Sequence, residues 1–517
     1  MLIPEAAQQD KEFLAQPEIS VGSGDISPLL MECLCATDVT ELDGVIKTWL
    51  QSSLTRNKNR SLEQLQFITQ QAYLSLSKLI NRQLDAVLHH PKFKALESSW
   101  CGLRYLTDIE SDYDEDLTIK IKVLNVTWRE LGKDLTRAIE FDQSNIFKRI
   151  YSDEFDTPGG EPYGVVLGDY TVTHRTRKGF GVNDLDVVEA MSSVAEAALC
   201  PFISSVDASL FGLDSLRDLS QPVNLSDIFK QQEYLRFNQL RNNESTRFVG
   251  LVLPDMLMRQ PYDDDDTHYQ AFNYQERIVD PDRDLLWGNS CYSFGGVLIR
   301  AFANTGWFAD IRGGVHDFGE GGVVRNLQYA NNRYTKDYSP KAATKTQIDD
   351  FLERELSDLG FIPLCSYHSV EHSVYYSNSS LHKSAEYTSE VASANAKLSS
   401  MLQYIMCVSR FGHYVKVIGR DKVGSFIGVD EFQRIFQNWL NKYTTSSDVN
   451  STELKARYPL SMSKVSVYEK PGKPGSYSCI LHLQPHFQLD QLVSSIKLIT
   501  ELASGAGSTA TALITNN

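Results

Sequence analysis

The residues whose types and spacing come closest to known catalytic chemistry are His368, Glu371 and His372, in the segment HSVEH. On a helix, two histidines four positions apart share a face and could hold zinc, with the glutamate as a general base. The flanking segments, FIPL at 361–364 and VYYSN at 374–378, are rich in β-branched and aromatic residues and predict strand, turn and strand. In a strand, residues four apart lie about 13 Å apart, too far to share one metal ion. We therefore predict surface or turn histidines, with a zinc hydrolase as the disfavoured alternative.

Two other segments have residue types suited to chemistry, and we decline both. The four aspartates Asp263 to Asp266 could bind a hard cation, but they lack the alternating spacing and closing glutamate of a calcium loop. They predict a solvated acidic loop. Asp317-Phe318-Gly319 matches a kinase tripeptide without the H-R-D loop or glycine-rich loop that a kinase needs. We predict no catalytic residue, no metal site and no cofactor, and hence a protein that is not an enzyme.

Composition limits the partners and the compartment. The chain has 517 residues, of which 42% are hydrophobic and 22% charged, as in ordinary globular proteins of two or three domains. A net charge of -16 argues against general nucleic-acid binding, which needs a basic face. The first residues, MLIPEAAQQDKEF, do not resemble a signal peptide, and no run of about 18 apolar residues predicts a membrane span. The eight scattered cysteines suit a reducing compartment, so we expect a cytoplasmic protein.

The amino-terminal part predicts an arm followed by helices. Residues 1–26 are polar and acidic and predict a mobile arm, and residues 27–110 form a helical region. Apolar residues at helical spacing predict a long helix from Leu62 to Leu88, before Pro91, and a second helix with Phe93, Leu96, Trp100 and Leu103 on one face.

A central mixed α/β domain with loop-rich insertions is expected over residues 111–390. Its first strand is predicted at 117–123, where apolar residues alternate with Thr118, Lys120 and Lys122. The continuous apolar run from Phe248 to Leu253 predicts a strand buried on both faces. A helical stripe from Val187 to Ala198 follows the period of an amphipathic helix.

The carboxyl-terminal domain, predicted over 391–502, combines helices with a β-hairpin. Apolar residues predict one helix at 398–408 and another at 432–443. Two alternating segments flank the turn Pro471-Gly472-Lys473-Pro474-Gly475, which predicts a hairpin. Residues 492–502 are compatible with strand or helix, and the small, polar residues 503–517 predict a disordered tail. The fold class is therefore α+β, with mixed α/β character and several domains.

Several blocks of the chain resemble one protein family. The most informative is Phe141 to Tyr170, FDQSNIFKRIYSDEFDTPGGEPYGVVLGDY, in which an apolar helical patch precedes a Gly-Gly-Glu-Pro turn and a short strand. Further blocks follow in the same order as in the family: 248–254, 286–313, 356–364, 395–412 and 459–498. Together they resemble the large sheath subunit of the type VI secretion system (the TssC, VipB or ImpC type).

The resemblance implies a structural role in a contractile, tail-sheath-like assembly in the bacterial cytoplasm. It implies a small sheath subunit of the TssB or VipA type, other copies of the chain, an inner-tube protein of the Hcp type, a baseplate and an AAA+ ATPase that disassembles the contracted sheath. The sheath of another phage-like contractile machine is the alternative.

The same resemblance implies that neighbouring subunits exchange strands near their termini. A hairpin leaves backbone N–H and C=O groups on its edges that can accept a partner strand. A head-to-tail contact made by a mobile arm generates a filament. We predict that the partner strands join the sheet at eight positions: Val465, Val467, Tyr477, Cys479, Leu481, Leu483, Ile496 and Leu498.

Overall fold

The computed structural model of the protein describes residues 44, 47, 62–116, 118–157, 159–176, 181–262, 274–314, 321–329, 343–366, 372–385, 387–422, 428–445, 452–469, 477–486, 496–502 and 513–516. The chain forms two compact units. The first comprises residues 1–90 and 262–277, and the second comprises residues 91–261 and 278–517.

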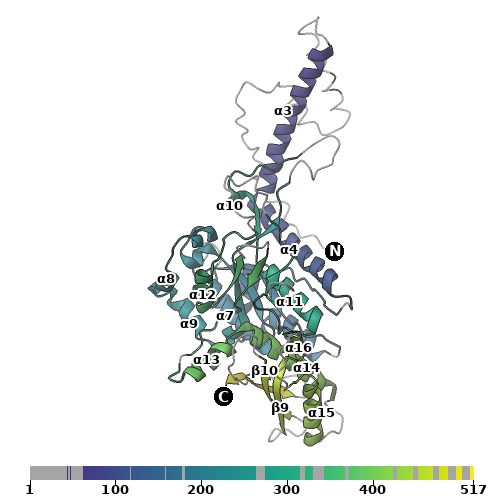
Figure 1. Ribbon diagram of the computed structural model, residues 1–517, viewed down its shortest axis with the longest axis vertical. Coiled ribbons are helices and arrows are strands. Elements are labelled where there is room, and N and C mark those ends of the chain that lie inside the picture. Colours follow the sequence, from purple (N-terminus) through teal and green to yellow (C-terminus); the bar gives the residue numbers. More distant parts are fainter. Residues whose placement is uncertain are drawn as a thin grey trace. The chain divides into compact units, whose positions relative to one another are not determined.

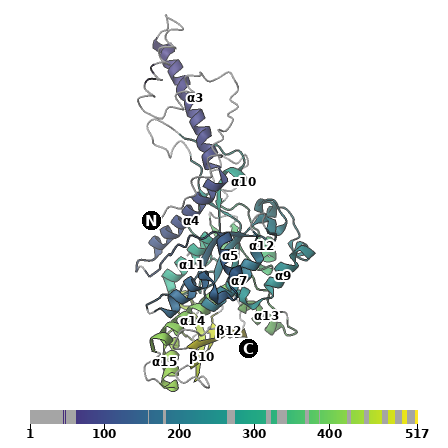
Figure 2. The same ribbon diagram turned by 180° about the vertical axis from the view of Figure 1, so that it is seen from behind.

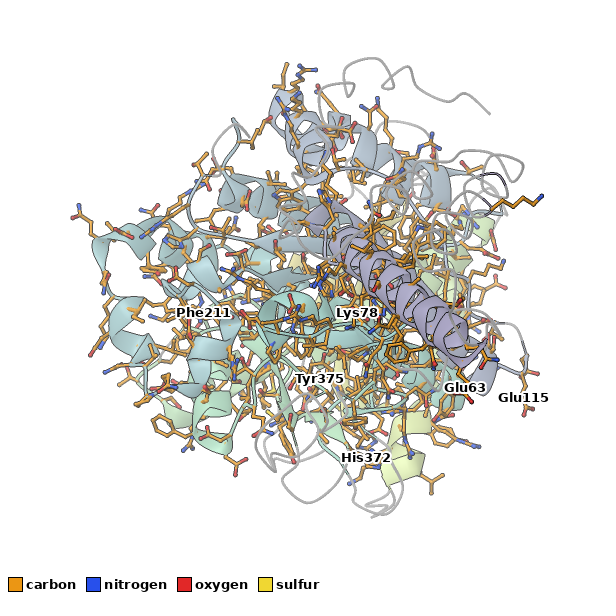
Figure 3. The ribbon with its side chains drawn as sticks, turned by 90° about the horizontal axis from the view of Figure 1, so that it is seen from above. Glu63, Lys78, Glu115, Phe211, His372 and Tyr375 are labelled. Carbon is orange, nitrogen blue, oxygen red and sulfur yellow. The ribbon has the colours of Figure 1, made fainter. Side chains whose placement is uncertain are left out.

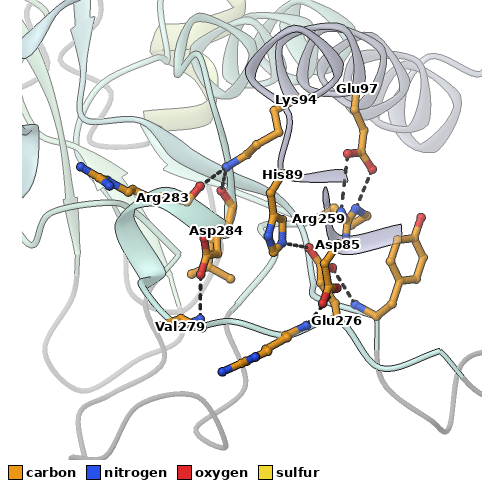
Figure 4. A network of polar contacts seen from close by, with 12 residues as sticks. Asp85, His89, Lys94, Glu97, Arg259, Glu276, Val279, Arg283 and Asp284 are labelled. Atoms are coloured by element: carbon orange, nitrogen blue, oxygen red, sulfur yellow. Dashed lines mark hydrogen bonds and ion pairs between the residues drawn. The ribbon is translucent and has the colours of Figure 1, made fainter. Parts of the chain in front are cut away.

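The first unit contains the long helix α3 (Leu62–Leu88), as the apolar pattern predicts. Residues 274–277 are tied to the carboxyl end of this helix. The Asp85 carboxylate accepts hydrogen bonds from the Tyr274 hydroxyl at 2.6 Å and from the Arg277 N–H at 3.3 Å. His89 Nε2 lies 3.1 Å from a carboxylate oxygen of Glu276 (Figure 4). The contact with Glu276 gives His89 a structural role at the end of the helix.

The second unit holds the described helices from α4 onwards and the sheets (Figure 1). Its described α-helices are α4 (Pro91–Tyr113), α5 (Trp128–Arg137), α6 (Asn145–Phe147), α7 (Asp184–Ala198), α8 (Leu225–Ile228), α9 (Leu235–Arg241), α10 (Pro281–Asp284), α11 (Cys291–Thr305), α12 (Asp350–Asp358), α13 (Glu390–Ser399), α14 (Leu402–Lys422), α15 (Val429–Asn441) and α16 (Thr452–Arg457). A π-helix, η3 (Lys148–Asp156), follows α6. The described 3-10 helices are η2 (Phe141–Gln143), η4 (Ala208–Phe211), η5 (Leu216–Ser220), η6 (Gln232–Tyr234) and η7 (Glu244–Phe248).

A central sheet organises the second unit. Within the described residues its strand order is β1-β2-β3-β7-β8-β6, built from β1 (Val166–Val172), β2 (Phe202–Val206), β3 (Val249–Leu253), β6 (Val323–Val324), β7 (Phe361–Ser366) and β8 (Ser373–Tyr375). The first four strands in this order are parallel, and β8 runs antiparallel to β7 and β6. A separate antiparallel pair joins β4 (Met256–Arg259) to β5 (Leu286–Gly288). The α+β fold class predicted from the sequence is confirmed.

The central sheet is buried on both faces, which explains its continuous apolar strands. Successive residues of β3 point to opposite faces of the sheet. Leu251 and Leu253 pack in one hydrophobic cluster with α7, and Val252 packs in another with α11. All five residues of β3 are buried, so the predicted two-sided strand is confirmed. Figures 1 and 2 show α7 and α11 beside the sheet, and Figure 2 shows α5 next to α7. In Figure 3, Phe211 and Tyr375 lie among the packed side chains.

Helix α4 packs through a different face from the predicted apolar stripe, and this face combines small and aliphatic residues. Its buried positions are Ser98, Gly102, Leu106 and Ile109. A Cβ on Gly102 would lie 2.4 Å from the ring of Tyr292 on α11, so this close approach requires glycine. By contrast, Trp100 is 65% exposed and Leu96 58% exposed, so the face that the sequence pattern singled out is largely open to solvent in this chain.

The predicted strand at 117–123 is wrong for its described residues. Residues 118–127 belong to no strand, and Val123 is 70% exposed. The local reason is the Asp114 carboxylate, which accepts from the Ile119 N–H at 2.6 Å and from the Thr118 hydroxyl at 2.9 Å, beginning the segment as a capped loop. Farther along, Lys120 and Lys122 contact Glu161 and Glu154 through their side chains. Alternation of apolar and polar residues does not by itself make a strand, because a strand also needs a neighbouring strand to pair with.

The family-like block at 141–170 joins the central part of this unit to the helix α14. The rings of Phe147, Tyr151 and Phe155 follow one another along α6 and η3, with centroids 5.0 Å and 4.8 Å apart. Phe155 then contacts the His413 ring on α14 at 5.7 Å. Gly160 is needed in the turn because a Cβ there would lie 2.2 Å from the Glu154 carbonyl oxygen. The block therefore serves packing.

His413 gives this joint a pH dependence. Burial and the nearby Arg410 lower its pKa to about 3, while its hydrogen bond to the Ala198 carbonyl, at 3.0 Å, acts in the opposite direction. Below pH 6.5 the unfolded chain binds a proton that the folded chain does not, so the free energy of unfolding falls by up to about 1.4 kcal/mol per pH unit between pH 6.5 and 3. We expect His413→Gln to flatten this acid slope when the purified protein is unfolded in urea at a series of pH values. The exposed His372→Gln is the control, and an equal slope in both variants would contradict the assignment.

Candidate assembly interface

The predicted interface residues lie in one antiparallel sheet at the carboxyl-terminal end of the second unit (Figure 1). Its order is β12-β11-β10-β9, from β9 (Leu460–Glu469), β10 (Tyr477–Pro485), β11 (Ile496–Leu502) and β12 (Leu513–Asn516). The predicted hairpin is confirmed, with Val465 opposite Leu481 and Val467 opposite Cys479. The turn residues 471–475 lie outside the described part of the chain.

One face of this sheet belongs to the protein's own core. Val465, Val467, Cys479, Leu481 and Leu483 are buried in the same hydrophobic cluster as residues of α14 and α15, among them Phe411 and Phe436. Burial raises the pKa of the Cys479 thiol to about 12, which keeps it protonated and unreactive at neutral pH. These five side chains stabilise the hairpin in its own subunit. Any contact that they make with a partner strand passes through their backbone.

The opposite face is open. Met462 and Tyr468 on β9 are 57% and 56% exposed, and Ile480 on β10 is half-buried. The alternation between buried and exposed residues along β9 is the period of two that the sequence predicts.

The outer edge of β9 is partly covered by the same chain. Gln437 of α15 accepts a hydrogen bond from the Val465 N–H at 3.0 Å and donates one to the Ser463 carbonyl at 3.2 Å. The Thr445 N–H donates to the Leu460 carbonyl at 2.9 Å, and the Leu460 N–H donates to the Tyr443 carbonyl at 3.3 Å. Gln437 is not among the residues that the sequence pattern singles out. Its place on α15 between the buried Phe436 and Leu440 gave no signal of an edge contact.

The other end of the sheet extends beyond the predicted hairpin. The sequence of residues 492–502 is compatible with strand or helix, and β11 shows that 496–502 is a strand. β11 pairs with β10 through Ile496 to Leu502 and with β12 through Ile496 to Ile499. β12 lies inside the stretch 503–517 that predicts disorder, so that prediction is wrong for 513–516. Residues 513–516 become a strand because the edge of β11 opposite β10 provides backbone hydrogen-bonding partners for them.

Thus the structure brings all eight predicted residues into adjacent strands, β9 to β11. Only the backbone pairing is described for Tyr477, Ile496 and Leu498. Contact of these residues with a partner strand stays a prediction.

The declined catalytic motifs gain no support from the described residues. His368 to Glu371 lie outside them, as do Asp263 to Asp266 and Asp317 to Gly319. His372 is exposed immediately before β8 and lies near the periphery in Figure 3. The strands predicted on both sides of the motif are confirmed as β7 and β8, which pair antiparallel. Across the described part of the chain no three His, Cys, Asp or Glu residues are grouped to hold a metal ion.

To cross a bilayer, a helix of the chain would need about 20 predominantly apolar residues. None of the helices in the described ranges combines the length and the apolar character needed to cross a bilayer.

Comparison with known proteins identifies the family of the chain. Residues 70–382 match the family described as EvpB/VC_A0108, tail sheath N-terminal domain. Residues 391–502 match the tail sheath gpW/gp25-like domain of the same family. A curated relative, the type VI secretion system sheath protein TssC1 of Pseudomonas aeruginosa, is 36% identical over 457 residues, covering 86% of this chain and 89% of the relative. The chain therefore belongs to the type VI secretion tail-sheath family, as a large sheath subunit.

Proposed function

We propose that the chain assembles with a small sheath subunit and with other copies of itself into a helical tube around an inner tube. The tube contracts to drive the delivery of effectors. The observation that carries the proposal is the match to both sheath domains together with a carboxyl-terminal sheet that ends, among the described strands, in the short β12. A short terminal strand leaves backbone groups that strand addition can satisfy.

Contraction in this proposal is a rigid-body rearrangement of packed subunits that stay linked by strands. The free energy is stored in the extended assembly, so the subunit needs no nucleotide site of its own. The inner-tube protein, the baseplate and a separate AAA+ ATPase are the further partners, and the assembly forms in the bacterial cytoplasm. The acidic balance of the chain, -16, gives no reason to add nucleic acid to this set.

Co-purification tests the proposal. The chain expressed alone should be insoluble or polydisperse, because its strand-accepting groups lack partners. Expressed with the small sheath subunit, it should become a defined complex that sediments as large particles. A chain that stays apart from the small subunit under these conditions would speak against the assembly.

A further inference from the structure

A small cavity lies inside the second unit, where α14 and α16 meet the end of β10 (Figure 1). Its wall includes Gln403 and Cys407 of α14, Lys455 of α16, and His486 directly after β10. The volume of the cavity is about 20 Å³. A single water molecule needs roughly 10–15 Å³ of such space, so the cavity is large enough to hold one.

Gln403 brings a buried amide group to this cavity. The residue is only 4% exposed, and its side-chain oxygen has no hydrogen-bond partner among the described residues. Buried amides in folded proteins almost always have partners, because an unpaired amide loses its bonds to solvent without replacement. The end of a glutamine side chain carries both an acceptor and donors, so it can bond either kind of group. The amide therefore points to a ligand in the cavity.

His486 supplies a second group, and its surroundings fix its protonation. The Nε2 atom is buried and has no partner in the described part of the chain. Burial and the charge of Lys455 lower the pKa of the ring, while backbone hydrogen bonds with Thr445 and Leu460 act in the opposite direction. The ring is therefore neutral at neutral pH. Since Nε2 makes no bond, the backbone bonds belong to Nδ1, which carries the proton and leaves a lone pair on Nε2.

The groups around the cavity favour a neutral ligand over an ion. A metal cation would lie beside the ammonium group of Lys455, which repels it. An anion would face the lone pair on Nε2 of the neutral His486 ring, which has no proton to donate there. A water molecule satisfies both conditions, because it can donate one hydrogen to Nε2 and still bond the Gln403 amide. The chemistry of the wall therefore selects water.

We propose that one ordered water molecule in this cavity links α14 to the end of β10, donating a hydrogen bond to Nε2 of His486 and bonding the side-chain amide of Gln403. Buried water usually makes about three hydrogen bonds, and the ammonium group of Lys455 is the third candidate on the wall. The backbone N–H of His486 donates to the Pro459 carbonyl at 2.8 Å, which fixes this residue to the end of the sheet. The water then connects helix and sheet within one subunit. It belongs to the folded chain and does not depend on the assembly.

A crystal structure of the purified protein, or of its complex with the small sheath subunit, tests the site directly. At a resolution that shows ordered water elsewhere in the core, a density peak should lie about 2.7–3.2 Å from both His486 Nε2 and the Gln403 amide. A cavity without such a peak, or a Gln403 amide turned onto a protein group, would overturn the water site.

Crystals grown in bromide distinguish water from an anion. Density in the cavity without an anomalous bromide signal supports the water. An anomalous peak between Lys455 and His486 would show an anion site instead and would overturn the assignment of a neutral ligand.

Paired substitutions test in solution whether Gln403 and His486 share one ligand. Gln403→Met keeps the length of the side chain without the amide, and His486→Phe keeps a ring without its nitrogens. The unfolding equilibrium constant in urea should rise several-fold less for His486→Phe in the Gln403→Met background than in the unaltered chain, because the shared water is already lost.

The matched control is His413→Phe, which alters another buried histidine that lies ten residues along α14 from Gln403 and does not line the cavity. Its effect should be the same in both backgrounds. Equal rises for His486→Phe in the two backgrounds would overturn the shared ligand. The crystal structure of the unaltered protein needs no variant, so it decides the question even where a substitution prevents folding.

Discussion

Deleting residues 1–26 is expected to leave the folded units intact and to block assembly or contraction of the sheath. The sequence predicts that this polar, acidic segment is a mobile arm, so the cores described above do not depend on it. An arm that adds a strand to a neighbour links each copy to the next, and losing it removes one link per copy throughout the tube. The expected effect is therefore close to all-or-none at the level of the assembly.

Thermal unfolding and circular dichroism of the co-purified complex should match the full-length chain, and electron microscopy should show no contracted tubes. The matched control replaces residues 1–26 with a Gly/Ser segment of equal length, which keeps the chain length but removes the side chains that favour a strand. It should fail as the deletion does. If the shortened chain assembles and contracts like the full-length one, the exchanged-arm mechanism is wrong for this protein.

Leu481→Asp should unfold the carboxyl-terminal sheet and abolish assembly. Leu481 is fully buried at the centre of β10, in the cluster formed with α14 and α15. An aspartate there would have to bury a charge or take up a proton, and it would also lose the packing of the leucine. We expect the free energy of unfolding to fall by about 4 kcal/mol or more.

The neighbouring residue supplies the control for this substitution. His482 points to the opposite, partly exposed face of the same strand, so His482→Asp should change stability by roughly 0.5 kcal/mol or less. Urea unfolding and hydrogen exchange of β10 compare the two. Equal effects of the two substitutions would contradict the burial of the Leu481 side chain in the core of its own subunit.

Much of the fold could be predicted from local patterns. The amphipathic stripe of α15 and the paired alternation of β9 and β10 each follow the period set by burial of one face, and the continuous apolar run at 248–253 reflects burial of its strand on both faces. These elements were therefore predicted correctly. The short strand expected directly after the Gly-Gly-Glu-Pro turn begins later than the pattern indicates, since β1 begins only at Val166.

Other features depend on contacts that a single segment does not encode. The predicted helix at 398–408 is two helices, since α13 ends at Ser399 and α14 begins at Leu402. The break is stabilised by contacts from distant residues: the Ser380 hydroxyl donates to the Ser400 carbonyl, and the Leu402 N–H donates to the Asn378 carbonyl. In the same way β12 acquires its conformation from β11, and residues 118–127 remain outside a sheet because no described strand lies beside them.

In the candidate interface, too, the sequence predicts the features that depend on a local pattern and not those that depend on contacts between distant segments. The sequence indicated which strands would lie together, because the hairpin pattern is local. It did not indicate that the inward side chains belong to the subunit's own core, nor that Gln437 covers one edge, because both depend on how α14 and α15 pack on the sheet. A contact that a single side chain makes with the edge of a strand leaves no repeating pattern in the sequence, so it cannot be predicted from periodicity.

Negative-stain electron microscopy of the chain co-expressed with the small sheath subunit tests the central claim most directly. We expect long, hollow tubes with a regular helical repeat, formed only when both proteins are present. A monodisperse, monomeric chain that persists in the presence of the small subunit would contradict the claim that this protein builds a contractile sheath.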